Sequence, residues 1–161
     1  MGERNDYYDD PQAPAANSVV PSAAAFVIRD GAVLLTKRSD NGNWSMPGGA
    51  QDPGESLTAT AIRETVEETG VTVRPTGLVG IFTDPKHVVH YTSNDEVRQE
   101  FTVVYRADYI SGEPTTSSET THVEWVPAEK VAGLRMDRSQ QIRLEWALQH
   151  PNQTRIDPVG D

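Results

Sequence analysis

The chain has 161 residues, a formal net charge of −10 at pH 7 and a hydrophobic content of 36%. That length can bury the core of one domain, and the acidic balance excludes a protein that holds nucleic acid through clustered lysines and arginines. The sequence has no cysteine, so disulfides, thiol nucleophiles and thiolate zinc sites are excluded as well.

Residues 1 to 17 are acidic and rich in Pro, Ala and Asn, which predicts a flexible acidic arm. They contain no apolar segment of the kind found in secretory signals, and the longest apolar run, residues 23 to 28, is too short to cross a membrane. We therefore expect a cytoplasmic protein without a membrane partner. The arm is a candidate for crossing to a second subunit, so a homodimer is a further expectation.

Two apolar segments follow the arm. Residues 22 to 28 and 32 to 37 are typical of strands, and residues 29 to 31 between them are typical of a turn, so we predict a hairpin. A polar loop over residues 38 to 43 then leads to Trp44, which we interpret as a packing residue.

Residues 42 to 71 combine a glycine-rich loop with a predicted helix. Ser56 suits the N-cap and Gly70 suits the left-handed residue that ends a helix at about Thr69. The glutamates at positions 64, 67 and 68 are three and four residues apart and share one face of that helix.

Three carboxylates so close together repel one another, which raises their pKa values unless a cation lies among them. Hard cations such as Mg²⁺ or Mn²⁺ take oxygen ligands of this kind. A solvated acidic face is the alternative, because like-charge pairs at this spacing cost only about 0.2–0.5 kcal/mol each. The joint spacing of loop and helix favours the metal site.

Residues 71 to 82 predict a strand with a kinked start, residues 84 to 94 a loop, and residues 97 to 110 one long strand. His87 and His90 suit a joint metal site only in a helix, because residues three apart in a strand point to opposite faces. A role outside metal binding is therefore favoured for both. Arg98 and Glu100 share the polar side of the long strand and are candidate substrate-binding residues.

The remaining chain predicts a turn-rich loop, a short strand, a brief helix, a last helix and a tail with little to pack. These elements are expected at residues 111–120, 122–126, 127–133, 138–149 and 151–161. Asp137 and Gln140 have the spacing of a pair that caps the last helix.

The glycine loop and its helix resemble the signature of the Nudix hydrolases. In this sequence the signature comprises Gly49, five residues, Glu55, seven residues, Arg63-Glu64, Glu67-Glu68 and Gly70-Val71. Every invariant polar or glycine position is present, and one aliphatic position departs because it is Thr65. The resemblance covers about residues 20 to 149, with the specific part at 44 to 71. It implies an α/β protein, an α/β/α sandwich with a mixed sheet, with a Nudix domain at residues 18 to 150.

The resemblance also implies hydrolysis of the pyrophosphate bond in a nucleoside diphosphate linked to a further group X. Mg²⁺ or Mn²⁺ would be held by Glu64, Glu67 and Glu68 with the carbonyl group of Gly48. Arg63 would orient the site by pairing with Glu55 or with a helix glutamate.

The general base is left open by the sequence. Glu119, in the loop before a Trp-bearing strand, resembles the base of some Nudix enzymes. Glu64 and Glu67 are alternatives, and Glu100 is a third. The distance from each carboxylate to the attacking water decides among them, and the sequence does not supply it.

The substrate is open too. Pro85 lies fifteen residues after Gly70, a spacing that in the family is associated with ADP-ribose hydrolysis, so ADP-ribose or a nucleotide sugar is one expectation. Nucleoside triphosphates, including oxidised ones, are the alternative. A nucleotide sensor without activity is a further alternative, and an isoprenoid diphosphate isomerase is disfavoured because the chain has no cysteine.

Overall fold

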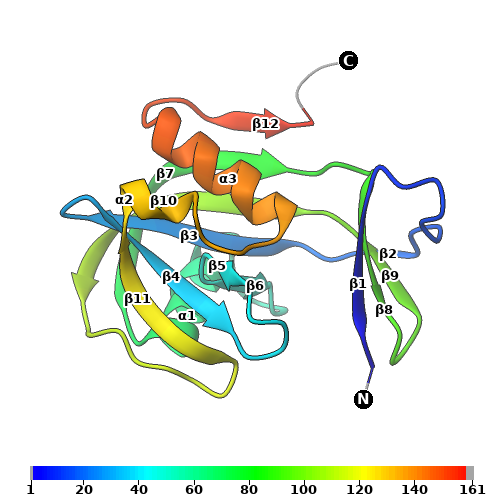
Figure 1. Ribbon diagram of the computed structural model, residues 1–161, viewed down its shortest axis with the longest axis horizontal. Coiled ribbons are helices and arrows are strands. Elements are labelled where there is room, and N and C mark those ends of the chain that lie inside the picture. The colour runs from blue at the N-terminus through cyan, green and yellow to red at the C-terminus, as the bar shows by residue number, and fades with distance from the viewer. Residues whose placement is uncertain (1, 159–161) are drawn as a thin grey trace.

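The computed structural model describes residues 2–158. Twelve strands and three helices are found in this part of the chain (Figure 1). In chain order they are β1 (Arg4–Tyr8), β2 (Ser18–Val19), β3 (Ser22–Arg29), β4 (Ala32–Arg38), β5 (Trp44–Ser45), β6 (Gly48–Ala50), α1 (Leu57–Thr69), β7 (Thr72–Phe82), β8 (His87–Tyr91), β9 (Glu96–Gln99), β10 (Thr102–Ser111), β11 (Thr120–Pro127), α2 (Ala128–Val131), α3 (Arg138–Gln149) and β12 (Arg155–Asp157).

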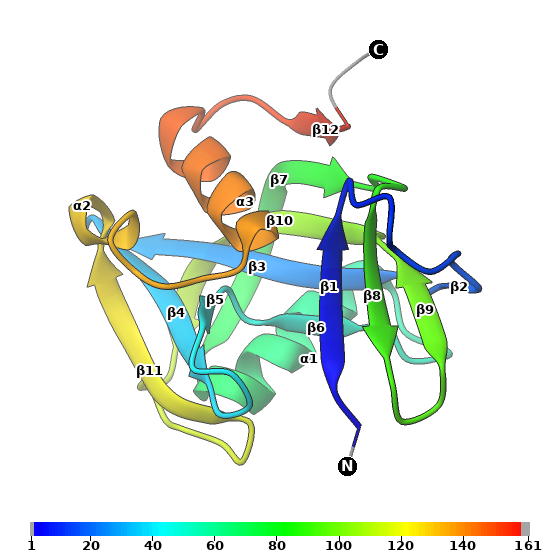
Figure 2. The same ribbon diagram turned by 45° about the vertical axis from the view of Figure 1, so that its right-hand side comes forward.

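The larger sheet is mixed. Its strand order is β11-β4-β3-β10-β7-β12, and the short strands β5 and β6 pair with β4 and β3. Strand β10 runs parallel to β3 and antiparallel to β7. Helices α1 and α3 lie on opposite faces of this sheet (Figures 1 and 2), so the predicted α/β/α sandwich is confirmed.

The core lies on both faces of β3. Residues 23 to 27 of this strand are all buried, which explains their unbroken apolar character. Phe26 packs with Leu144 of α3 in one hydrophobic cluster, and Val27 packs with Val71 in the other. Trp44 packs against the first cluster, in agreement with its interpretation as a packing residue.

The predicted hairpin is present, but β3 and β4 pair only next to their turn. Asp30 and Gly31 form that turn with positive φ angles of 50° and 76°. Two residue pairs join the strands there. Strand β4 pairs with β11 along its other edge, and β3 pairs with β10. The hairpin therefore opens, and the glycine strand β6 takes a place beside the free part of β3.

A second, four-stranded sheet with the order β1-β8-β9-β2 corrects two predictions; we call it the small sheet. Residues Arg4–Tyr8 were expected in a flexible arm, and they instead form β1, which pairs with β8 over five residues of the same chain. Residues His87–Tyr91 were expected in a loop and form β8. Composition missed β1 because its strand partner, β8, lies about 80 residues away, whereas β8 also pairs with the nearby strand β9.

The predicted long strand over residues 97 to 110 is two strands in different sheets. The chain changes sheets at Glu100 and Phe101, where the Glu100 amide donates to the His87 carbonyl and the Phe101 carbonyl accepts from Ser22. Alternation of side chains continues across this change, so the sequence pattern does not reveal it.

Helix α3 has the predicted bounds, yet its start differs from the prediction. Asp137 makes no capping bond, because its carboxylate accepts from the Asn43 side chain at 2.9 Å. The Gln140 side chain accepts from the Met46 amide at 3.0 Å. Both predicted capping residues thus fix the loop that leads to the glycines.

The tail also departs from its prediction, since residues Arg155–Asp157 form β12 and pair with the edge strand β7. Among the described helices, none combines the length and the apolar composition needed to cross a bilayer.

Candidate active site

Helix α1 holds the three signature glutamates on one side, as predicted. The hydroxyl group of Ser56 accepts from the Ala59 amide at 3.0 Å, and Gly70 ends the helix with φ of 76°. Thr65, where the Nudix pattern has an aliphatic residue, is fully buried and donates its hydroxyl to the Ala61 carbonyl. The departure at Thr65 therefore leaves no unpaired polar group in the core.

Arg63 organises the acidic cluster. Its guanidinium donates to both carboxylate oxygens of Glu55, at 3.0 and 2.7 Å, and to the Ala50 carbonyl at 3.1 Å. It also donates to Glu64 at 2.9 Å and to Glu67 at 3.2 Å. The expected pairing with Glu55 and the helix glutamates is present, and the Arg63 hydrogen bond lowers the pKa of Glu55 to about 2.

Glu64 and Glu68 are close neighbours in a partly buried place. Burial raises the pKa values of both carboxyl groups, and in Glu68 the adjacent Glu64 raises the pKa further. The Gly48 amide donates to Glu68 at 3.4 Å. A shared burial of two carboxylates is costly unless a proton or a cation joins them.

The glycine loop fits closely against these carboxylates. A Cβ atom on Gly49 would lie 2.6 Å from the Glu64 carboxyl carbon, so only glycine lets this side chain rest on β6. The hard oxygen donors of Glu64 and Glu68 fit a divalent cation such as Mg²⁺. Within residues 2–158 no three acidic or imidazole groups are already gathered as a metal site, and Arg63 engages two of the three glutamates.

These carboxylates lie in a cleft of about 510 Å³ between the larger sheet and the small sheet. The acidic side chains on one side come from α1, beside the glycine strand β6, and the loop before β11 brings Glu119 to the same cleft. The structure therefore brings together Gly48, Arg63, Glu64, Glu67, Glu68 and Glu119 from the predicted set.

Arg98 also borders the cleft, from the opposite side. Glu100 borders it as well, but its side chain is only 5% exposed. Its carboxylate accepts from the Asp84 amide, from His87 and from Arg143 at 3.0, 3.1 and 2.6 Å. Glu100 is thus engaged by three donors of the protein, which argues against the predicted contact with substrate or water.

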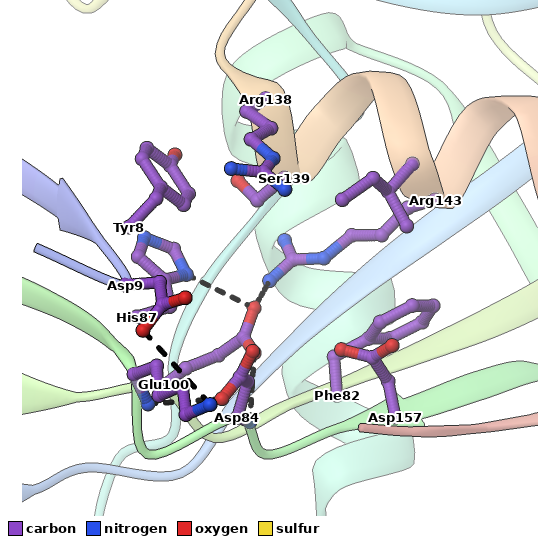
Figure 3. Close-up of a pocket in the computed structure, with 12 residues that line it drawn as sticks. Tyr8, Asp9, Phe82, Asp84, His87, Glu100, Arg138, Ser139, Arg143 and Asp157 are labelled. Carbon is purple, nitrogen blue, oxygen red and sulfur yellow. Dashed lines mark hydrogen bonds and ion pairs between the residues drawn. The ribbon is translucent and has the colours of Figure 1, made fainter. Parts of the chain in front are cut away.

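Figure 3 shows this buried group in a smaller hollow of about 70 Å³. His87 and Arg143 converge on Glu100, and the Tyr8 ring stacks on His87 at 4.3 Å between centroids. His90 instead contacts Asp95 at 3.1 Å. The two histidines of β8 thus make separate contacts.

Sequence reasoning missed three arginines that border the cleft, Arg4, Arg38 and Arg143. Arg4 lay in the supposed flexible arm, and Arg143 lay on a helix whose predicted role was packing. Arg38 ends β4, and its guanidinium is paired with Asp40 of the following turn at 2.7 Å.

The NUDIX domain profile matches residues 19–146, most of the chain. The chain belongs to the Nudix family. It is 34% identical over 146 residues to a MutT-like protein of Streptomyces ambofaciens, covering 88% of this chain and 86% of that protein. The sequence-based prediction of a Nudix hydrolase is thereby confirmed.

Two further similarities are more distant. An ADP-ribose pyrophosphatase of Methanocaldococcus jannaschii is 26% identical and covers 73% of this chain and 69% of that protein. The crystal structure of an ADP-ribose pyrophosphatase from Streptococcus suis aligns with a TM-score of 0.67 and 21% identity, over 86% of this Nudix chain and 98% of that one. The latter similarity shows the fold alone.

Proposed function

We propose that this Nudix protein hydrolyses the pyrophosphate bond of a nucleoside diphosphate linked to a further group X, with Mg²⁺ or Mn²⁺ as cofactor. The observation that carries this proposal is the partly buried carboxylate pair Glu64 and Glu68, pressed against the glycine strand in a large cleft. Glu67 and the Gly48 carbonyl group would complete the ligands. When bound, the cation supplies the positive charge that a pyrophosphate needs in this acidic cleft.

The other residues have positioning and proton-transfer roles in this proposal. Arg63 holds Glu64 and Glu67 in place through its rigid guanidinium, which Glu55 anchors from the other side. Glu119 is exposed at the rim of the cleft and is the proposed general base, which takes a proton from the attacking water.

ADP-ribose or a nucleotide sugar is the proposed substrate. A cleft of about 510 Å³ is within the usual range for small-molecule sites. The similarity to the ADP-ribose pyrophosphatase of Methanocaldococcus jannaschii supports the same class. Pro85 adds no support, because it is exposed in the turn before β8, outside the described residues that border the cleft.

The deciding experiment offers ADP-ribose, UDP-glucose, a dinucleoside polyphosphate and nucleoside triphosphates to the wild type and to Glu68→Gln, with Mg²⁺ or Mn²⁺. We expect wild-type turnover of a nucleoside diphosphate compound that chelation abolishes, and a loss in Glu68→Gln of roughly 100-fold or more in kcat. Glu145→Gln, on the exposed face of α3, is the matched control and should retain activity. Turnover that persists in Glu68→Gln would overturn the metal site.

The proposed base is tested by Glu119→Gln in the same assay. Because general-base catalysis typically contributes about 10²–10⁴-fold, kcat should fall within that range while KM changes little. An unchanged kcat would return the role to Glu64 or Glu67.

A further inference from the structure

Residues on one face of the small sheet border the cleft, and we call this face the wall. The small sheet itself, β1, β8, β9 and β2, stands beside the larger sheet in Figure 2. In the strand register Arg4 lies opposite Tyr91, and Val89 lies opposite Arg98. Because alternate residues of a strand share a face, these four side chains lie on the same side of the sheet, and all four border the cleft. The wall thus stands across the cleft from the acidic helix.

Tyr91 and Arg98 form the centre of this wall. The guanidinium carbon of Arg98 lies 4.9 Å from the centroid of the Tyr91 ring. Glu96 accepts from two nitrogens of Arg98, at 3.1 and 2.9 Å, and Ser18 donates to the same carboxylate at 2.7 Å. The planar guanidinium is therefore held over the Tyr91 ring before any ligand arrives.

The charges on this wall are balanced. Arg98 is paired with Glu96, and Arg4 is paired with Asp6 at 3.1 Å. The α1 side is acidic and needs cations to accept phosphates, whereas the wall is balanced in charge and presents the Tyr91 ring with the planar Arg98 guanidinium. An uncharged planar group suits the wall better than a phosphate does.

We propose that this face of the small sheet binds the nucleobase of the substrate, stacked against the Tyr91–Arg98 pair. The inference rests on the proposed function for the placement of the phosphates beside α1. Aromatic rings and arginine guanidiniums both stack on bases, and stacking tolerates different bases because every base has a π face. The small sheet would then select nucleotides as a class.

Binding of AMP, which has no pyrophosphate bond, is the test, with inorganic pyrophosphate as the base-free probe. Calorimetry in Mg²⁺ should show AMP affinity falling roughly 5- to 150-fold in Tyr91→Ala, the range expected from loss of one stacked base. Tyr91→Leu, which keeps apolar volume, should lose as much, whereas Tyr91→Phe should restore binding. Pyrophosphate affinity should stay the same in all three.

Tyr7→Leu is the matched control, because Tyr7 pairs with Val88 and faces the other side of the same sheet. In steady-state assays with ADP-ribose, Tyr91→Leu should raise KM more than it lowers kcat. The inference is overturned if AMP binding does not depend on Tyr91, if the wild type binds no AMP, or if pyrophosphate binding weakens in parallel.

These outcomes are separable from the proposed function. If turnover requires metal and is lost in Glu68→Gln, but KM is unchanged in Tyr91→Leu, the inference alone is overturned. AMP binding that depends on Tyr91, in a protein that cleaves none of the offered compounds, would overturn the proposed function alone.

Discussion

Two residues beside the signature glutamates control the shape of the acidic site. Arg63 joins four carboxylates, those of Asp52, Glu55, Glu64 and Glu67, through one guanidinium. Gly49 leaves room for the Glu64 carboxyl group. The first role depends on charge and the second depends on the absence of a single carbon atom. Both therefore belong to the geometry of the site, although neither need touch a substrate.

Gly49→Ala should separate activity from stability. The new Cβ would displace the flexible end of Glu64, so the free energy of unfolding should change by less than about 1 kcal/mol. A displacement of about 1 Å in the site should lower kcat/KM roughly 100-fold. Thermal unfolding and steady-state kinetics measure the two effects.

Gly77→Ala is the control, because a Cβ there would meet open space and Gly77 lies outside the described border of the cleft. It should keep wild-type kinetics. Equal activities in Gly49→Ala and Gly77→Ala would contradict the close fit of Glu64 on the glycine strand.

At the scale of elements, Glu100 joins the small sheet to α3. The carboxylate contacts Arg143 of α3 and His87 of β8, and both partners have side chains less than 10% exposed. Burial alone would raise the pKa of Glu100, but the hydrogen bond from His87 and the charge of Arg143 outweigh it and lower the pKa to about 2. The ionised form therefore stabilises the junction.

Glu100→Gln should lower the free energy of unfolding at neutral pH by about 3–5 kcal/mol, as expected when a buried ion pair loses one partner. The folded-state pKa of about 2 is below the ordinary value of 4.5, so the contribution is complete above pH 4.5 and is lost as pH falls through about 2. The stability difference between wild type and variant should shrink across that window in denaturant titrations. Glu145→Gln should show no such trend, and a constant difference for Glu100→Gln would contradict the assignment.

At the scale of the whole molecule, the sequence predicted the features that depend on residues close together in the chain. Ser56 and Gly70 bound α1 as expected, and the spacing of the signature placed Glu64, Glu67 and Glu68 on one side of a cleft. Strand pairings between residues distant in the chain could not be predicted from the sequence pattern. The strand Arg4–Tyr8 depends on β8, and the opposite wall of the cleft depends on the register of Arg98 with Val89, which periodicity alone does not define.

The position of β10 affects how the protein forms during translation. When a ribosome has released residues 1 to 100, the nascent chain already carries every residue proposed to hold the cation. It still lacks β10, which lies between β3 and β7, two of the strands of the larger sheet on which α1 packs. Until β10 inserts, those strands have no common neighbour and α1 has no continuous surface to rest on. The nascent chain should therefore bind the cation only after the second half of the chain has been made, although the residues proposed to hold the cation belong to the first half.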